Sequence, residues 1–405
     1  MATKGRERRK LIVLALGAVG LAGALTAASW IAPSRTIAAA ATYLPRDPSE
    51  VVEKVPVRDA AEVRARQALA AAPERLDLAV GLARDDLRRY RALSDPRYLG
   101  RAQASLARWW GLAAPPPDVL LLRATIEQSV HQFGDARADL DRLIAVRPDD
   151  AQALLTRAVV AAITADYPAA RASCDAVARL ASPLVAATCA APLDAIAGHA
   201  DAAYARLAAL VRASRTGDAA VRGWALTELA ELAYMRGDAR AAEAHLAAAL
   251  ALDPDDAYAR NLLADGLIAA GRGAEASQLL AGREQIDSHL VRRAIAEHQL
   301  QGADAARLVQ RMRERIAAAA DRGDRVHLRE EARFALAVDR DATRAVRIAR
   351  DNWNVQKELA DARLLVDAAA AARDRAAAAP VIAWAQTTGV RDAALERGLA
   401  QLERL

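Results

Sequence analysis

The stretch that decides the fold is RGWALTELAELAYMRGDARAAEAHLAAALALDPDD, residues 222–256. It holds two segments rich in Ala and Leu, and Ala has the highest helix propensity of all residues. Between them lies Gly237-Asp238, where glycine permits a positive φ and aspartate can cap the next helix. Pro254 ends the second segment, because proline cannot continue a helix. The stretch therefore predicts two helices joined by a tight turn, with Ala242 as the small residue at their crossing.

The same pattern recurs upstream with a period of 34 residues. Such a period is typical of stacked helix–turn–helix units, in which each hairpin contacts its neighbours. No segment of useful length alternates apolar and polar residues as a half-buried strand would, so we expect an all-α fold. The residue pairs related by this spacing are Leu121 and Leu155, Arg123 and Arg157, Ala124 and Ala158, Phe133 and Tyr167, Ala136 and Ala170, and Leu140 and Cys174.

The repeat resembles the tetratricopeptide repeat family. Leu229 and Ala230 stand where that family has its Leu-Gly pair, and Leu226 replaces its aromatic residue. The resemblance is specific over Asp118–Arg283 and implies an α-solenoid of stacked repeats. It implies little about the partner, because one fold serves many functions.

Composition and proline positions divide the rest of the chain. Pro192 falls inside the first helix of the third repeat, which we expect it to kink or shorten. The predicted parts are a cytoplasmic basic segment at 1–10, a transmembrane helix or signal core at 11–32, a linker at 33–58, a first helical layer at 59–117, tetratricopeptide-like repeats at 118–283, and divergent helical repeats with a C-terminal capping helix at 284–405. Outside the repeats, helices are expected at Asp59–Ala71, Leu76–Leu93, Arg97–Trp110, Leu290–Leu300, Ala303–Ala320, Val326–Val338, Ala342–Asn352, Val355–Ala372, Arg375–Thr387 and Asp392–Leu405.

The N-terminal residues carry an export signal. A basic cluster between Lys4 and Lys10 precedes Leu11–Ala32, which holds no charged residue. As a helix this segment would span about 33 Å, enough for a bilayer core of about 30 Å. Because positive charge stays on the cytoplasmic side, we predict a single-pass protein of the bacterial inner membrane with its repeats in the periplasm. The alternative is a cleaved signal peptide, cut near Ala39-Ala40-Ala41, that releases a soluble exported protein.

The charge pattern argues against a nucleic-acid partner. The net charge is +5, from 56 basic and 51 acidic residues. Nearly all the basic residues are Arg, as is common in proteins from GC-rich bacterial genomes. In the most basic stretch, Arg283–Arg350, acidic residues are interspersed, whereas nucleic-acid binders segregate their charge.

No catalytic or metal-binding pattern is present in the sequence. The six His residues show no recognised ligand spacing, and no phosphate-binding or nucleophile motif occurs. We therefore expect no enzyme, no metal site and no cofactor. Cys174 and Cys189 are the only cysteines, and they lie equidistant from a predicted turn at Ser182-Pro183. A disulfide between them is geometrically allowed, and the alternative is two small buried side chains.

The resemblance places partner binding on the concave face, which the first helices of the repeats line. Aromatic and amide groups there suit an extended polypeptide, and we expect a protein or peptide partner. The alternative is that Trp224, Tyr234 and Tyr258 fill the core between repeats. The function predicted is a non-catalytic scaffold, with an assembly or accessory factor for a neighbouring membrane or metal-handling protein as the alternative. The groove residues implied are Gln128, Gln152, Trp224, Thr227, Glu231, Tyr234, Tyr258, Asn261 and Asp265.

Overall fold

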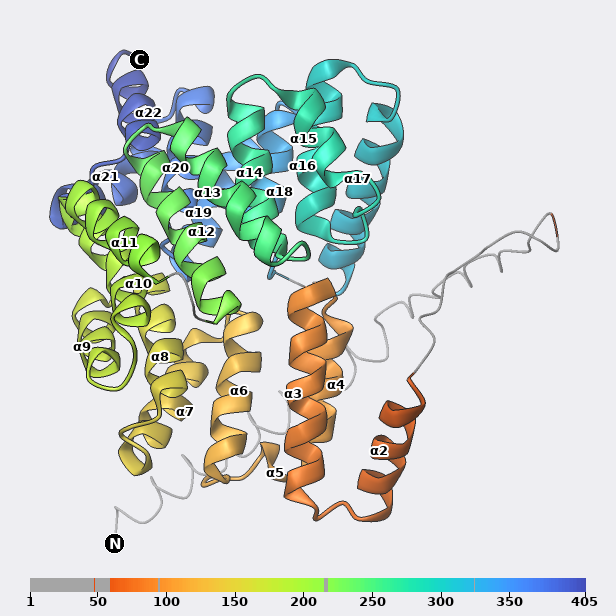
Figure 1. The fold of residues 1–405 in the computed structure, drawn as a ribbon. Helices are drawn as coiled ribbons and strands as arrows, with labels where there is room; N and C mark the ends of the chain where they lie inside the picture. Colours follow the sequence, from red (N-terminus) through yellow and green to blue (C-terminus); the bar gives the residue numbers. More distant parts are fainter. Residues whose placement is uncertain (1–46, 48–58, 94, 215–217, 324) are drawn as a thin grey trace, which may run out of the picture. The chain divides into compact units, whose positions relative to one another are not determined.

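The computed structural model describes residues 47, 59–93, 95–214, 218–323 and 325–405, and every regular element among them is a helix (Figure 1). These helices belong to one unit, Asp59–Leu405, which confirms the all-α prediction. The predicted membrane or signal helix at Leu11–Ala32 lies outside the described residues. Among the helices that are described, none is both long and apolar enough to cross a bilayer.

The first layer has a core of its own and contains a break that the sequence did not indicate. Its helices are α2 (Ala60–Ala71), α3 (Leu76–Leu93), α4 (Arg97–Ser105) and α5 (Ala107–Trp110). The single helix expected at Arg97–Trp110 is wrong, because Leu106 leaves the helical conformation with φ −95° and ψ 4°. Leu106 is fully buried and shares a core cluster with Trp109 of α5. At the break between α4 and α5, these two side chains pack into the same core.

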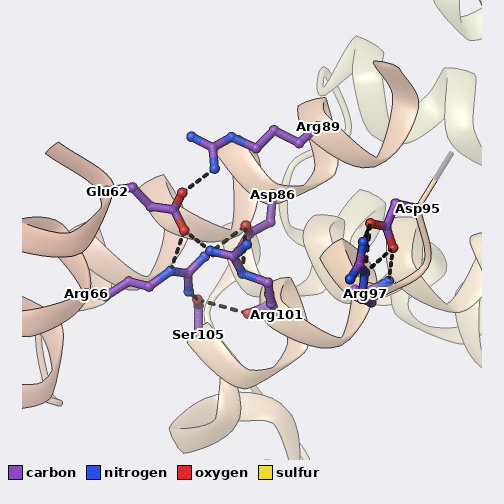
Figure 2. A network of polar contacts seen from close by, with 8 residues as sticks. All are labelled: Glu62, Arg66, Asp86, Arg89, Asp95, Arg97, Arg101 and Ser105. Atoms are coloured by element: carbon purple, nitrogen blue, oxygen red, sulfur yellow. Dashed lines mark hydrogen bonds and ion pairs between the residues drawn. The ribbon is translucent and has the colours of Figure 1, made fainter. Parts of the chain in front are cut away.

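Helix α2 is held to the first layer mainly by charge, since none of its residues is buried. Glu62 pairs with Arg66 at 2.9 Å and also contacts Arg89 of α3 and Arg101 of α4 (Figure 2). Arg66 donates to both carboxylate oxygens of Asp86 on α3, at 2.8 and 2.7 Å. Desolvation is the main reason that the pKa of Asp86 is raised, because its side chain is only 2% exposed. This network adds to the packing of the partly buried Leu69 of α2 against the apolar core of the first layer.

Five helical hairpins follow, and the two helices of each pack side by side. The crossing alanines Ala170, Ala203, Ala242 and Ala276 are at most 1% exposed, so backbones approach closely there. The hairpins are α6 (Pro117–Ser129) with α7 (Phe133–Val146), α8 (Ala151–Ile163) with α9 (Tyr167–Ala178), α10 (Pro183–Asp194) with α11 (Ala200–Ala213), α12 (Ala219–Met235) with α13 (Ala239–Leu252), and α14 (Ala257–Ala269) with α15 (Gly273–Leu280).

Aspartates start the helices of these hairpins. Asp150, Asp166, Asp238 and Asp256 each accept a hydrogen bond from the backbone N–H three residues later, at 3.0 to 3.2 Å. Such caps satisfy donors that the first helical turn leaves unpaired. Gly237, at the turn before Asp238, has a φ of 79°, which glycine adopts without strain.

Pro192 does not interrupt its helix as expected. Helix α10 continues through Pro192 to Asp194. A π-helical turn then runs over Ala195–His199, and Gly198 within it has a φ of 85°. Because Pro192 has no backbone N–H, it cannot donate to the carbonyl four residues earlier, and the α-helical pattern gives way to the π-helical turn three residues later.

Three further helical pairs and a final helix complete the unit. The pair predicted around Val355 needs correction, because α19 extends to Val355 and the next helix begins only at Leu359. Its start is fixed by a capping box between Glu358 and Asp361, which the sequence analysis overlooked. The elements are α16 (Asp287–Leu300), α17 (Ala305–Asp321), α18 (Leu328–Ala337), α19 (Ala342–Val355), α20 (Leu359–Ala372), the 3₁₀ turn η2 (Arg375–Ala378), α21 (Ala379–Thr388) and α22 (Ala393–Glu403).

The C-terminal pairs fold back onto the earlier hairpins. One core cluster joins residues of α10–α14 with residues of α18–α22. The indole N–H of Trp384 in α21 donates to the hydroxyl of Tyr167 in α9, at 2.7 Å. The backbone N–H of Lys357 donates to the carbonyl of Ile163 at the end of α8, also at 2.7 Å. Distant repeats of the array therefore touch one another.

Candidate partner-binding site

Helix α12 carries a row of polar and aromatic side chains. Its opposite face is apolar and buries Leu226, Leu229 and Ala230. Residues three and four apart share one face of a helix. This spacing places five side chains in this row, namely Trp224, Thr227, Glu228, Glu231 and Tyr234.

Glu231 joins α12 to α14. The hydroxyl of Tyr258 donates to Oε1 of Glu231 at 2.8 Å. Tyr258 is 51% exposed, yet desolvation by the surrounding protein is the leading cause that raises its pKa well above the usual value. The structure thus brings two of the predicted groove residues together, and the ring of Tyr258 is accessible to a partner.

Glu228 lies one turn before Glu231 and has no partner. Among the described residues, Glu228 takes part in no hydrogen bond and no ion pair. Desolvation and then the charge of Glu231 raise its pKa well above the usual value. Desolvation also raises the pKa of Glu231, in spite of the bond from Tyr258. Two carboxylates without a bound cation therefore share this part of α12.

Asp265 of α14 is fully engaged by arginines. The guanidinium of Arg292 in α16 binds both of its oxygens at 2.8 Å, and Arg333 of α18 also donates to it. Desolvation acts to raise the pKa of Asp265, but these two guanidinium groups outweigh it, and the pKa is lowered. Asp265 therefore ties three helices together and is not a free groove residue.

Helices α18 and α20 supply inner residues that the sequence analysis missed. Arg329 donates to both oxygens of Asp361 at 2.6 and 2.7 Å and also binds Glu358. Arg363 of α20 is paired with the buried Asp392. Asp367 is exposed, yet desolvation raises its pKa to about 6. Their spacing was the available signal, since Arg329 and Arg333, like Arg363 and Asp367, stand one turn apart on the first helix of a pair.

We call Glu228, Glu231, Tyr258, Asp265, Arg329 and Arg333 the inner cluster. It spans α12, α14 and α18, and the guanidinium groups of Arg329 and Arg363 are close enough to influence the pKa of Glu231. Its two arginines, Arg329 and Arg333, are paired with carboxylates other than Glu228 and Glu231. These two glutamates therefore have no cationic partner within the cluster.

Polar atoms beside the inner cluster lack partners. Among the described residues, the Thr227 hydroxyl, the Tyr234 hydroxyl and Oδ1 of Asn261 are buried without a hydrogen bond. Asn261 uses its Nδ2 to bind Ser288 at 2.9 Å, and Tyr234 lies against the backbone of α14 at Gly266. Buried polar atoms are nearly always paired in folded proteins, so three on adjoining helix faces mark this region as unusual.

The other predicted groove residues are placed differently. Trp224 packs against the small core cluster that contains Cys174 and Cys189, as the alternative for this residue held. Tyr234 likewise packs against the main core. Gln152 donates to the hydroxyl of Thr156 on its own helix at 3.3 Å. Gln128 is a partly buried residue of α6.

Cys174 and Cys189 form a disulfide in the structure. Their Cα atoms are 5.6 Å apart, and they join α9 to α10 across the turn at Ser182. Ser182 caps α10 by accepting from the backbone N–H of Val185 at 3.4 Å. Within the described part of the chain, no three His, Cys, Asp or Glu residues converge as metal ligands would.

A shallow hollow of about 500 Å³ lies elsewhere, on α9, α10 and α11. Its lining is mostly alanine, and its two arginines, Arg171 and Arg206, both bind Asp194. Since its charges are already paired, it offers a ligand little beyond apolar contact.

Comparison with known proteins agrees with the hairpin architecture. The tetratricopeptide repeat family model matches residues 233–297, which extend from the end of α12 into α16. No curated protein sequence matches the chain.

Several solved structures match this chain at low identity and with TM-scores below 0.5. A tetratricopeptide repeat protein from Parabacteroides merdae is 12% identical, with 71% of this chain and 96% of that chain covered and a TM-score of 0.36. The APC/C hetero-tetramer Cut9–Hcn1 is 13% identical, with 76% and 52% covered and a TM-score of 0.41. The P58(IPK) TPR domain is 15% identical, with 77% and 93% covered and a TM-score of 0.21. On its hairpins and the match at residues 233–297, this chain carries tetratricopeptide-type repeats.

Proposed function

We propose that this protein is a non-catalytic scaffold of a bacterial cell envelope, and that it binds a protein or peptide partner at the inner cluster. Tetratricopeptide-type repeats generally mediate protein–protein interaction. The observation that carries the proposal is Tyr258, whose side chain is 51% exposed while its hydroxyl is held by Glu231 at 2.8 Å. Accessible tyrosine side chains held in place by the protein are frequent anchors for a partner chain.

Affinity capture from detergent-solubilised membranes tests the proposal. The wild-type protein is expected to retain a specific partner that Tyr258→Ala loses. Val146→Ala is the control, because Val146 is 63% exposed at the end of α7 and belongs to no part of the inner cluster. Equal retention by all three proteins contradicts binding at the inner cluster, and no specific partner for the wild type contradicts a scaffold.

The envelope location is supported by the basic cluster before Leu11–Ala32 and by the Cys174–Cys189 disulfide, since disulfides persist in oxidising compartments. Fractionation combined with intact mass tests it. A membrane-bound species of full mass supports an anchor, and an exported species that lacks about the first 40 residues supports signal cleavage. Cytoplasmic protein with two alkylated thiols contradicts both.

A further inference from the structure

We infer that the inner cluster binds a basic segment of a polypeptide, with a lysine or arginine side chain held between Glu228 and Glu231. This inference rests on the proposed function and adds the chemistry of the partner. It starts from the charges of the inner cluster. Neither Glu228 nor Glu231 has an ion pair among the described residues, although arginines are close by.

The nearby arginines are committed elsewhere. Arg329 holds Asp361 and Glu358, Arg333 holds Asp265, and Arg363 holds Asp392. Turning Arg329 or Arg363 toward Glu231 would take a cationic partner from a buried carboxylate, which is costly, whereas Asp265 would keep Arg292 if Arg333 turned away. Asp361 and Asp392 have side chains with no exposed surface, so these two pairs in particular cannot be given up. Among the described residues, Arg329 and Arg363 are therefore held by these pairs, and the inferred cation for Glu228 and Glu231 is supplied by the bound partner.

The unpaired polar atoms point to the same ligand. Thr227, only 5% exposed, lies next to Glu228 and one turn before Glu231, and its hydroxyl has no partner among the described residues. Oδ1 of Asn261, one turn beyond Tyr258 on α14, is an acceptor that is also unused there. A lysine ammonium brings three donors and an arginine five, whereas the site offers mainly acceptors. A lysine or arginine side chain therefore complements the site in hydrogen bonding as well as in charge.

General attraction of polycations does not explain such binding. Residues 59–405 carry 47 basic and 47 acidic side chains, so the net charge of this part neither attracts nor repels basic peptides. Binding of a basic side chain therefore has to be local, and desolvation around Glu228 and Tyr258 strengthens a charge-assisted contact there. Tyr258, half exposed, can lie along the aliphatic part of the bound side chain or contribute a cation–π contact.

Degenerate nonapeptide pools with a fixed central residue test the inference. One pool has lysine at the centre and the other has acetyl-lysine, which keeps the aliphatic part of the side chain but removes the charge. The immobilised wild-type protein is expected to retain the lysine pool at least about tenfold better. Glu228→Gln and Glu231→Gln are expected to abolish this preference, and Glu74→Gln, an exposed glutamate between α2 and α3, is expected to keep it.

Equal retention of the two pools by the wild type, including no retention of either, overturns the inference. So does an undiminished lysine preference in Glu228→Gln. The substitutions keep side-chain size, and an unchanged thermal midpoint shows that each variant is folded. The affinity capture described above separates the two ideas. If Tyr258→Ala loses a partner that Glu228→Gln and Glu231→Gln retain, the scaffold stands and the basic segment does not.

Discussion

At the scale of single residues, Glu127 of α6 is a buried acid that reports on pH. Its side chain is 10% exposed and lies 3.9 Å from Arg123, but the guanidinium of Arg123 is bound to Asp139. Desolvation, and then the charge of Asp139, raise the pKa of Glu127 to about 7. Oε2 of Glu127 has no hydrogen-bond partner among the described residues.

This raised pKa predicts a loss of stability as pH rises. Between the unfolded pKa of 4.5 and the folded value of about 7, the native protein binds more protons than the unfolded chain. The free energy of unfolding therefore falls as pH rises through this window, by up to about 3 kcal/mol for this residue. Glu127→Gln should be more stable than wild type at pH 8 and similar to it at pH 4.5, as measured by urea unfolding. A wild-type advantage at pH 8 would show that the carboxylate is stabilising instead.

At the scale of elements, α2 is expected to detach before any other described helix. Glu62 holds three arginines, and α2 buries no residue that would keep it in place without them. Glu62→Gln should therefore speed amide hydrogen exchange in Ala60–Ala71 while leaving α3 protected. Salt at about 1 M, where the Debye length is about 3 Å, should act in the same direction.

The control for this prediction is Asp77→Asn. Asp77 pairs with Arg75 on the surface, where both side chains are more than half exposed, and such pairs contribute little to stability. Exchange in α2 should not respond to that change. If Glu62→Gln leaves exchange in Ala60–Ala71 unchanged, apolar contacts such as that of Leu69 hold the helix instead.

Many of the helices and turns could be predicted from the sequence, because they are determined by residues close together in the chain. The period of 34, the turn at Gly237 and the aspartate caps depend on neighbouring residues, and the helix predicted at Leu76–Leu93 has those bounds. The break at Leu106 could not be predicted from the local sequence. It accompanies the burial of Leu106 in a core to which another helix also contributes.

The same reason explains which inner residues were found. Glu231, Tyr258 and Asp265 follow from the repeat frame. Although spacing marks Arg333 as a residue on the first helix of a pair, its place beside Asp265 could not be predicted, because the two residues are 68 positions apart. A repeat pattern specifies how one unit packs on the next. It does not specify the contacts between distant units, which depend on side chains far apart in the sequence.

At the scale of the whole described unit, the contact between Trp384 and Tyr167 should couple the C-terminal helices to the repeats. The two residues are 217 positions apart. Tyr167→Phe removes the acceptor and leaves a partly buried indole N–H unpaired, which should lower the free energy of unfolding by about 1–3 kcal/mol. Hydrogen exchange should rise most in α20–α22.

Tyr98→Phe is the matched control. Tyr98 is 7% exposed in α4, and its hydroxyl makes no hydrogen bond among the described residues. Its loss should leave α20–α22 as protected as in the wild type. An equal effect of the two substitutions would mean that the bond to Trp384 contributes nothing beyond the hydroxyl itself.

Contact between distant repeats also limits how the array can change its length. In an open solenoid, a unit can be gained or lost by duplication or deletion, because each hairpin meets only its neighbours. Here the bond between Trp384 and Tyr167 and the bond between Lys357 and Ile163 depend on the number of hairpins between the bonded residues. One extra hairpin inserted between α10 and α20 would displace Trp384 from Tyr167 and Lys357 from Ile163. Loss of these bonds would disfavour any change in the number of hairpins between the two contacts.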